Sequence, residues 1–297
     1  MISIVTPSFQ EARSLPLLYS RLSEALKGLD WEWIAVDDHS NDGSFAALRE
    51  LAAADPRVRG VRLARRSGSH AAITCGLERA RGEAAVVMAA DLEDPPEAVL
   101  ELVEAWRQGA QVVWAECSGP AKPVSSRLYH RLVRRLAGIG EMPASGSDFF
   151  LLDRGVMDAF ARFGEGNTSV FALVAWMGFR QARVRCEKQP RVTGRSGWTR
   201  RAKLKLLADS VTAFSLLPVR AMSVAGFLAA VSGFAYAALV AANYFAGKPP
   251  QGWSSLMVAV LVMGGLQMLM LGVLGEYIWR ALEESRRRPR YLVEEET

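Results

Sequence analysis

The sequence contains few residues of the types that build disulfide frameworks or histidine-ligated metal sites. Among its 297 residues are three histidines, none with metal-site spacing, and three scattered cysteines, Cys75, Cys117 and Cys186. Cysteines distributed in this way are typically reduced or packed in a core, which argues against a disulfide-stapled or zinc-binding fold. The basic start of a signal peptide is also absent, and residues 2–5 are predicted to form a first strand instead.

Two stretches in the C-terminal third lack charge. Met222–Ala246 contains no charged residue, and Trp253–Ile278 contains only Glu276. Each exceeds the roughly 20 residues that an α-helix needs to cross a bilayer, and Gly247–Gly252 provides a tight turn between them. We therefore expect a transmembrane hairpin, with a hairpin buried in a protein core as the alternative.

The excess of positive charge, +5 overall, lies beside these apolar stretches. Only Lys248 lies in the predicted turn, whereas basic residues are frequent before the first stretch and after the second: Arg200, Arg201, Lys203, Lys205, Arg220, Arg280, Arg286, Arg287, Arg288 and Arg290. By the positive-inside rule we expect a multi-pass protein of the inner (plasma) membrane with both termini cytoplasmic. Nucleic acid is not expected as a partner, because these residues do not form a basic face interleaved with aromatic residues.

The N-terminal part of the chain alternates between short apolar runs and helical patterns. Strands are predicted, with helices between them, at residues 2–6, 31–36, 58–63, 84–90 and 111–115. This alternation is typical of an α/β fold with a mostly parallel, Rossmann-like sheet that is covered on both faces. Further along, Phe149–Leu152 is predicted as another strand, and Asp153 is expected to cap the helix after it.

A cluster of carboxylates follows the central predicted strand. Val86–Ala90 is apolar, and Asp91, Glu93 and Asp94 come directly before two prolines, which cannot continue a strand. Open α/β sheets bind ligands at the carboxyl ends of their strands, and carboxylates are the ligands that hold Mg²⁺ or Mn²⁺ against a diphosphate. The alternative is an acidic strand-to-helix turn, in which Asp94 and Glu97 favour the N-terminus of the next helix.

A second basic segment covers residues 126–136. Leu128, Leu132 and Leu136 recur every four residues with arginines between them, which predicts a basic amphipathic helix. Such a helix either lies at a membrane surface or packs its leucines on the sheet.

Several motifs occur in order along the chain: Pro7–Glu11, Val36–Ser40, Ala90–Glu97, Gly146–Phe149 and Arg191–Ser196. Together with the predicted hairpin, they resemble family 2 glycosyltransferases of the polyprenyl-phosphate type, a group that includes dolichol-phosphate mannose synthase. The resemblance covers essentially the whole chain, and the stretch from Asp91 to Glu97 is specific to this branch of the family.

This resemblance implies an inverting glycosyltransferase with a GT-A fold over residues 1–195. The expected donor is a nucleotide sugar, UDP-linked rather than GDP-linked, and the expected acceptor is a polyprenyl (undecaprenyl) phosphate at the cytoplasmic membrane face. Amphipathic interface helices are expected over residues 196–220, the hairpin over 221–280 and a basic tail over 281–297. Because sheet edges accept further strands, the segment Pro289–Val293 of this tail is also predicted to pair with a neighbouring subunit of a homo-oligomer.

The resemblance further implies roles for residues that bind the donor nucleotide. Pro7, Glu11 and Asp37 match positions that hold the base and the ribose, since carboxylates accept hydrogen bonds from base N–H groups and hydroxyls. Asp38 either joins them or caps the turn that follows it.

The reacting end of the donor and the acceptor are assigned to other residues. Asp91 and Glu93 match the positions of the metal, Mg²⁺ or Mn²⁺, and of the diphosphate. Contacts to the donor diphosphate or the acceptor phosphate are assigned to arginines, namely Arg127, Arg191 and Arg195. Asp148 falls where the family places its catalytic base. An acceptor phosphate with a second pKa of about 6 is already ionised at neutral pH, which favours an orienting role for this residue.

Some positions depart from the family pattern. Ala89 stands where relatives usually carry Asp, Glu93 stands where Gln is usual, and Gln10 replaces a common Asn. The missing carboxylate keeps a second function class open, a membrane-anchored, non-catalytic scaffold that binds nucleotide sugar. A processive polysaccharide synthase is not favoured, because the sequence has no Gln-x-x-Arg-Trp motif.

Overall fold

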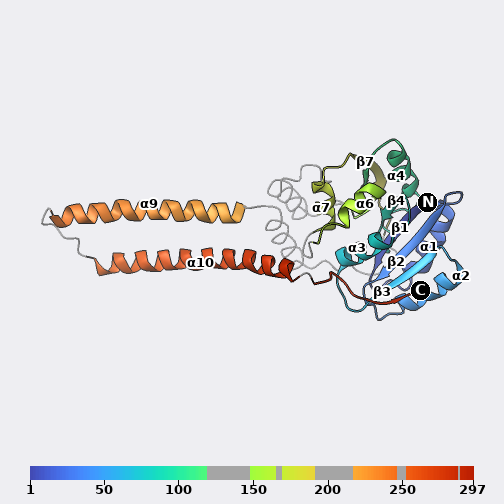
Figure 1. Ribbon diagram of the computed structural model, residues 1–297, viewed down its shortest axis with the longest axis horizontal. Helices are drawn as coiled ribbons and strands as arrows, with labels where there is room; N and C mark the ends of the chain where they lie inside the picture. The colour runs from blue at the N-terminus through green and yellow to red at the C-terminus, as the bar shows by residue number, and fades with distance from the viewer. Residues whose placement is uncertain (119–147, 165–168, 191–216, 246–251, 287) are drawn as a thin grey trace. The chain divides into compact units, whose positions relative to one another are not determined.

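The computed structural model of the chain describes residues 1–118, 148–164, 169–190, 217–245, 252–286 and 288–297 (Figure 1). The chain divides into two compact units. The first is Met1–Ser210 together with Arg288–Thr297, and the second is Val211–Arg287. The end of the chain therefore belongs to the same unit as its beginning.

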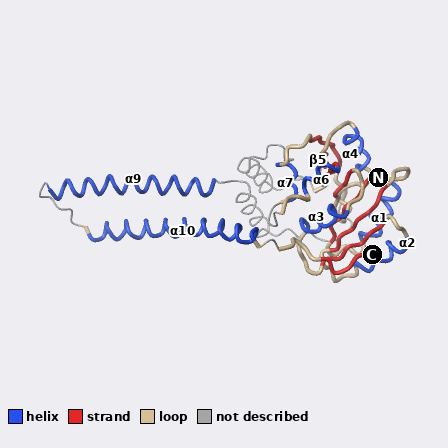
Figure 2. The backbone as a smooth tube through the Cα atoms, in the orientation of Figure 1, coloured by secondary structure: helices blue, strands red, loops and turns tan. Residues whose placement is uncertain are grey.

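The first unit is built on one mixed, mostly parallel sheet with the strand order β7-β5-β6-β4-β1-β2-β3-β8 (Figure 2). The strands are β1 Ile2–Ser8, β2 Trp31–Asp37, β3 Val58–Leu63, β4 Ala84–Val87, β5 Val112–Ser118, β6 Phe150–Asp153, β7 Gln181–Glu187 and β8 Val293–Glu296. β1 pairs in parallel with β2 and β4, and β2 pairs in parallel with β3. β6 is antiparallel to β4 and β5, and β8 is antiparallel to β3.

Helices connect the parallel strands and cover the sheet. They are α1 Ser14–Ala25, α2 Ser44–Ala54, α3 Ser69–Arg79, α4 Ala98–Arg107, α6 Arg154–Phe160 and α7 Val170–Trp176. The leucines at 15, 18 and 22 recur at helical spacing on α1, and all three are fully buried in one core with Ile4 and Trp33. This core lies on one face of the sheet.

α3 packs against the other face of the sheet at close range. Val5 follows Ile4 along β1 and therefore points to the opposite face. A Cβ atom at Gly76 would lie 2.3 Å from Cγ1 of Val5, so only glycine allows this approach. The contact holds α3 against the centre of the sheet, with its first turn beside the carboxyl end of β1.

The mostly parallel α/β sheet is confirmed, with differences in particular strands. β4 ends at Val87 rather than at Ala90, and β6 enters the sheet antiparallel between β4 and β5. Asp153 caps α6 as predicted, by accepting a hydrogen bond from the backbone N–H of Gly155 at 2.9 Å. The sequence pattern does not predict β7, because its half-buried positions alternate with exposed ones and carry charged residues.

The prediction for the cysteines agrees with the structure at one position and is wrong at another. Cys75 is free and buried, as expected. Cys186 on β7 is disulfide-bonded, which corrects the expectation that the cysteines are reduced. The parallel pairing of β5 with β7 makes Cys117 and Cys186 Cα partners across the two strands. Their separation in the sequence gives no sign of this register, because β7 itself is not predicted.

The C-terminal tail forms β8 on the sheet of its own chain, rather than on a neighbouring subunit as predicted. The pairing with β3 is extended by backbone hydrogen bonds from Ala64 N to Leu292 O (2.8 Å) and from Thr297 N to Gly60 O (3.0 Å). β3 is the outermost strand of the parallel series β1, β2 and β3, so one of its edges is open to backbone hydrogen bonds from the tail.

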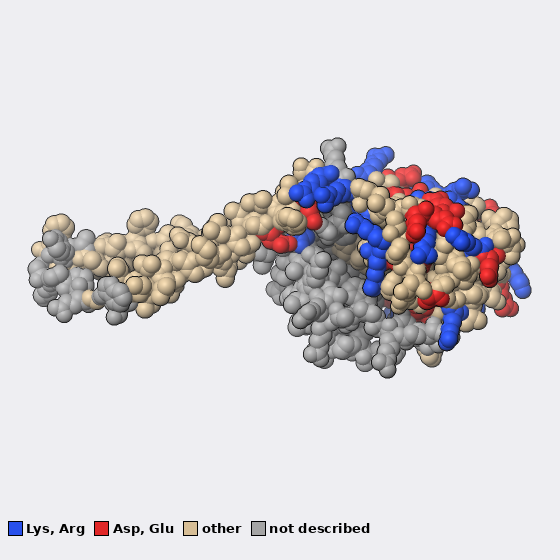
Figure 3. Space-filling model, turned by 90° about the horizontal axis from the view of Figure 1, so that it is seen from below, with Lys and Arg blue, Asp and Glu red and all other residues tan. Residues whose placement is uncertain are grey.

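The second unit contains, among its described residues, two long helices, α9 Leu217–Phe245 and α10 Trp253–Ser285. Val219–Val240 has a mean hydropathy of 1.8 and Leu256–Ser285 one of 2.2, and both are long and apolar enough to cross a membrane. Large apolar side chains such as Phe234, 78% exposed, point outward, and Figure 3 shows charged residues only near one end of the visible, described surface of this unit. Such surfaces are unfavourable in water and suit a lipid environment.

Candidate active site

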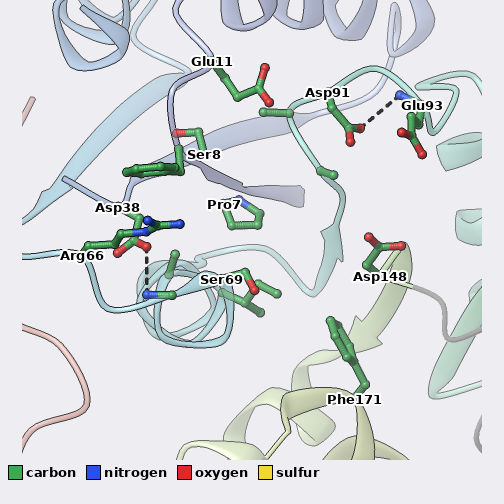
Figure 4. A pocket seen from close by; sticks show the side chains of 16 residues that line it. Pro7, Ser8, Glu11, Asp38, Arg66, Ser69, Asp91, Glu93, Asp148 and Phe171 are labelled. Atoms are coloured by element: carbon green, nitrogen blue, oxygen red, sulfur yellow. Dashed lines mark hydrogen bonds between the residues drawn. The ribbon is translucent and has the colours of Figure 1, made fainter. Parts of the chain in front are cut away.

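A cavity of about 560 Å³ opens where β1 and β4 end (Figure 4). The residues that line it come from the end of β1, from the loops after β1, β2, β3 and β4, from α3 and α7, and from the segment just before β6. They are Pro7, Ser8, Phe9, Glu11, Asp38, Arg66, Gly68, Ser69, Ala72, Ile73, Ala89, Ala90, Asp91, Glu93, Asp148 and Phe171. Six residues that the sequence singles out therefore meet in one place: Pro7, Glu11, Asp38, Asp91, Glu93 and Asp148.

The carboxyl end of β1 supplies the first wall. Pro7 is the sixth residue of β1 and pairs with Val36 on β2. The loop that follows the strand continues along the cavity wall. Glu11 is held by the first turn of α1, because its Oε2 accepts a hydrogen bond from Ser14 Oγ at 2.6 Å. Its backbone N–H donates to Ser44 Oγ at 2.9 Å, which ties this loop to α2.

The two aspartates at the end of β2 occupy different environments. Asp37 is fully buried and is not among the cavity-lining residues; its Oδ2 accepts a hydrogen bond from Ser40 N at 3.2 Å. Asp38 lines the cavity, and its carboxylate accepts backbone N–H groups from Ser67 at 2.6 Å and Gly68 at 2.8 Å. Burial raises the pKa of Asp38, although both hydrogen bonds oppose this shift.

The turn after β4 directs two carboxylates to the cavity. Leu92 has φ of 62°, a left-handed conformation that is costly for a leucine, and its side chain is buried in the core. This conformation places Asp91 and Glu93 on the cavity side, and Asp91 Oδ1 accepts a hydrogen bond from Glu93 N at 3.1 Å (Figure 4). The prediction that this loop presents carboxylates at the end of a central strand agrees with the structure.

Asp94 and Lys188 form a charged pair behind these carboxylates that the sequence did not reveal. Lys188 follows β7, and its Nζ lies 3.3 Å from Glu93 Oε2 and 3.4 Å from Asp94 Oδ1. A backbone hydrogen bond from Gln189 N to Glu93 O, 2.8 Å, fixes the segment in place. Neither Asp94 oxygen accepts a hydrogen bond from the described residues, and the side chain is 2% exposed.

These carboxylates share one buried region. Burial first, and then the charge of Asp148, raises the pKa of Asp94 to about 7, although Lys188 opposes the shift. The same carboxylates, with Asp94 foremost, raise the pKa of Lys188 above its ordinary value against the effect of burial. Asp148 lines the same cavity as Asp91 and Glu93.

Asp94 should make stability depend on pH. Its native pKa of about 7 lies above its unfolded value, so the folded state loses stability as pH rises from about 4 to 7, by roughly 4 kcal/mol at most. Asp94→Asn removes this proton linkage. We expect the midpoint of thermal unfolding to fall less between about pH 5 and pH 7.5 in the variant than in the wild type. An equal fall in both proteins would contradict the assignment.

Arg66 is a further lining residue that the sequence analysis did not single out. Its guanidinium lies 4.0 Å from the centroid of the Phe9 ring, and both side chains line the cavity beside Asp38. The pair combines a cation with an aromatic face at the ends of β1 and β3. The predicted phosphate-binding residues Arg127, Arg191 and Arg195 lie outside the described residues.

The carboxylates fit a divalent metal only together with a ligand. No group of three or more His, Cys, Asp or Glu side chains among the described residues could hold a metal by itself. Asp91 and Glu93 nevertheless offer two hard oxygen ligands at the cavity wall, and Mg²⁺ is commonly held by one or two carboxylates plus substrate phosphates. These two residues would hold the ion.

The Rossmann-like sheet, with carboxylates at the ends of its central strands, is a GT-A fold, the fold of one large class of glycosyltransferases. Residues 3–160 match the profile of the glycosyl transferase family 2, and the chain belongs to this family. Glucosyl-3-phosphoglycerate synthase from Mycobacterium tuberculosis is similar in structure, with a TM-score of 0.51 and 20% identity over 72% of this chain and 80% of that chain.

Curated relatives match almost the whole chain. An uncharacterized glycosyltransferase of Bacillus subtilis, YkcC, is 38% identical over 98% of this chain and 93% of its own length. The bactoprenol glucosyl transferase of Shigella phage SfV is 31% identical over 99% and 98%, respectively. A prophage bactoprenol glucosyl transferase homolog of Escherichia coli is 30% identical over 98% of both chains.

Proposed function

We propose that this glycosyltransferase moves a sugar from a nucleotide sugar, UDP-linked rather than GDP-linked, to a polyprenyl phosphate such as undecaprenyl phosphate. The observation that carries the proposal is the cavity, which joins the nucleotide-type loops after β1 and β2 to the carboxylates after β4 and to Asp148. The relatives named bactoprenol glucosyl transferases support a polyprenyl acceptor, since bactoprenol is a polyprenyl lipid.

The donor would bind along the carboxyl ends of β1, β2 and β4. Pro7, Glu11, Asp37 and Asp38 would hold the base and the ribose. The buried Asp37 offers an oxygen that no described residue hydrogen-bonds. A donor N–H or hydroxyl would satisfy it once the loops shift around the ligand.

Asp91 and Glu93 would hold Mg²⁺ or Mn²⁺ against the donor diphosphate. When bound, such an ion supplies positive charge that stabilises the leaving nucleoside diphosphate. The two side chains reach the cavity from the same turn, and Lys188 keeps Glu93 in position from behind. The chain would thus bind the metal jointly with its substrate.

The transfer itself needs one displacement. An acceptor phosphate oxygen forms a bond to the anomeric carbon while the bond from that carbon to the diphosphate breaks, so the configuration is inverted. The acceptor phosphate, with a second pKa of about 6, is already ionised at neutral pH. Asp148 would therefore act mainly by orienting the acceptor or a sugar hydroxyl beside the reacting carbon.

A polyprenyl phosphate lies with its lipid chain in a membrane, so the enzyme must reach it at the membrane surface. α9 and α10 would form a hairpin in the inner membrane, with the catalytic unit and both termini cytoplasmic, because basic residues flank the hairpin and only Lys248 lies in its turn. Arg127, Arg191 and Arg195 would bind the acceptor phosphate or the donor diphosphate.

A donor panel tests this function. The purified full-length protein in detergent is incubated with undecaprenyl phosphate and radiolabelled UDP- and GDP-sugars, with Mg²⁺, with Mn²⁺ or with EDTA. We expect label to enter the organic phase from a UDP-sugar, only with lipid and a divalent metal present. Transfer that persists in EDTA would contradict the metal assignment, and transfer from GDP-sugars alone would contradict the assigned base.

A further inference from the structure

The C-terminal strand carries an irregularity next to the proposed nucleotide site. β8 pairs with β3 so that Arg62 faces Glu295 and Leu63 faces Val293, which leaves Glu294 as an extra residue between them. A bulge of this kind interrupts the alternation of a strand and re-aims a side chain. Here it allows Glu294 to reach Arg62, whose Nε donates a hydrogen bond to Glu294 Oε2 at 2.9 Å.

The three consecutive glutamates of β8 each bind a different arginine. Glu295 accepts a hydrogen bond from Arg49 on α2, and Glu296 accepts one from Arg79 on α3 at 2.6 Å. These two pairs fasten the strand to helices. Glu294 reaches the end of β2 through Arg62, and its Oε2 also lies 3.5 Å from Nδ1 of His39 in the loop after β2.

Arg62 connects the tail to the loop after β2. Its Nη2 donates a hydrogen bond to Ser40 O at 3.2 Å, and its Nη1 lies 3.9 Å from Asp37 Oδ2. Ser40 in turn donates from its backbone N–H to the same carboxylate oxygen of Asp37. One guanidinium thus contacts the carboxylate of Asp37, the loop that follows it and Glu294.

The loop that Arg62 holds is joined to the loop after β1. Ser40 Oγ accepts a hydrogen bond from Gln10 N at 2.9 Å, and Asp38 N donates to Ser8 O at 2.9 Å. Gln10 has φ of 58°, and His39 in the other loop has φ of 61°. Left-handed residues of this kind cost free energy and persist only where their surroundings hold them.

We propose that Glu294 is a positioning residue for the donor nucleotide, acting on Asp37 through Arg62 and on the loop after β2 through both Arg62 and His39. The inference rests on the proposed function in that Asp37 and Asp38 bind the nucleotide. The tail thereby contributes to donor binding without touching the donor. Without the Glu294 carboxylate, Arg62 and His39 both lose a partner, so the loop after β2 loses its side-chain contacts to this residue of the tail.

Two variants of the full-length protein in detergent separate this role from simple fastening of the tail. Glu294→Gln removes the charge that holds Arg62, and the matched control Glu295→Gln removes the neighbouring ion pair with Arg49 on the same strand. Hydrogen–deuterium exchange of residues 38–41 is measured without nucleotide. Binding of UDP and GDP is then measured by calorimetry.

We expect faster exchange at residues 38–41 in Glu294→Gln only, together with UDP affinity that is about 5- to 20-fold weaker than in the wild type. Equal exchange in the two variants would overturn the positioning role. Faster exchange with unchanged UDP affinity would overturn its link to the donor. If the wild type binds neither nucleotide, the proposed function fails, and the exchange comparison still decides whether Glu294 holds the loop.

Discussion

Replacing Asp91 with asparagine should lower the rate of glycosyl transfer by at least about 100-fold, because the side chain loses the charge that faces the donor diphosphate and its metal. Asp91 lines the cavity from a turn held by the buried Leu92, so the substitution changes charge and leaves the backbone in place. Turnover is measured with the donor identified by the panel, at saturating lipid and with Mn²⁺ titrated.

Asp158→Asn is the matched control for this variant. Asp158 lies on α6, is 61% exposed and pairs with Arg154 one helical turn away, so it carries the same change of charge outside the cavity. We expect this control to keep wild-type turnover and wild-type dependence on Mn²⁺. Wild-type turnover in Asp91→Asn would contradict the metal assignment.

Asp148→Asn should lower kcat by about 100-fold or more, while the KM for the donor stays within about threefold. Asp148 lies two residues before β6, on the cavity wall that also includes Phe171, and its charge acts on Asp94. The loss would fall on the transfer step, because this residue is assigned to the acceptor and the reacting carbon.

The thermal midpoint and UDP affinity of Asp148→Asn provide the control. Removing one charge from the group formed with Asp91 and Asp94 should leave folding intact and lower the pKa of Asp94, since Asp148 raises it. If kcat stays normal and only the donor KM rises, Asp148 belongs to the donor site, and its assignment to the reacting centre is wrong.

The sequence is most informative where a buried strand ends in polar residues. Val86 and Val87 are fully buried, and the Asp-Leu-Glu-Asp-Pro-Pro segment after them carries both the turn and the carboxylates. Apolar runs followed by prolines and carboxylates are local signals, so the loop after β4 could be predicted. The two long apolar helices could be predicted for the same reason, since their length and hydropathy are properties of consecutive residues.

The parts that the sequence analysis missed depend on contacts between distant residues. Lys188 reaches Glu93 and Asp94 only because β7 pairs with β5, and β7 has too few apolar residues to be recognised. A lysine next to a glutamate in an unpredicted strand gives no sign of a buried partner. Asp94 itself belongs to the predicted carboxylate cluster, so its lysine partner is the part that the sequence does not indicate.

The end of β2 shows why adjacent residues can differ in role. Asp37 is the last residue of β2 and is buried near Arg62, whereas Asp38 follows the strand and lines the cavity. Asp38 lines the cavity, and its predicted nucleotide-binding role stays a proposal. Its carboxylate also accepts backbone N–H groups, as the alternative of a turn cap requires. These groups belong to Ser67 and Gly68 in the loop after β3, however, and not to the turn that follows Asp38.

The nucleotide released during turnover is the most direct test of the proposed function. The full-length protein in detergent is incubated with its donor and undecaprenyl phosphate, and the nucleotide and the lipid product are identified by mass spectrometry. Transfer of the sugar to the lipid phosphate predicts one nucleoside diphosphate per glycosylated lipid, and a lipid that keeps a single phosphate. A nucleoside monophosphate with a diphosphate-linked lipid, or nucleotide binding without any transfer, would contradict this account.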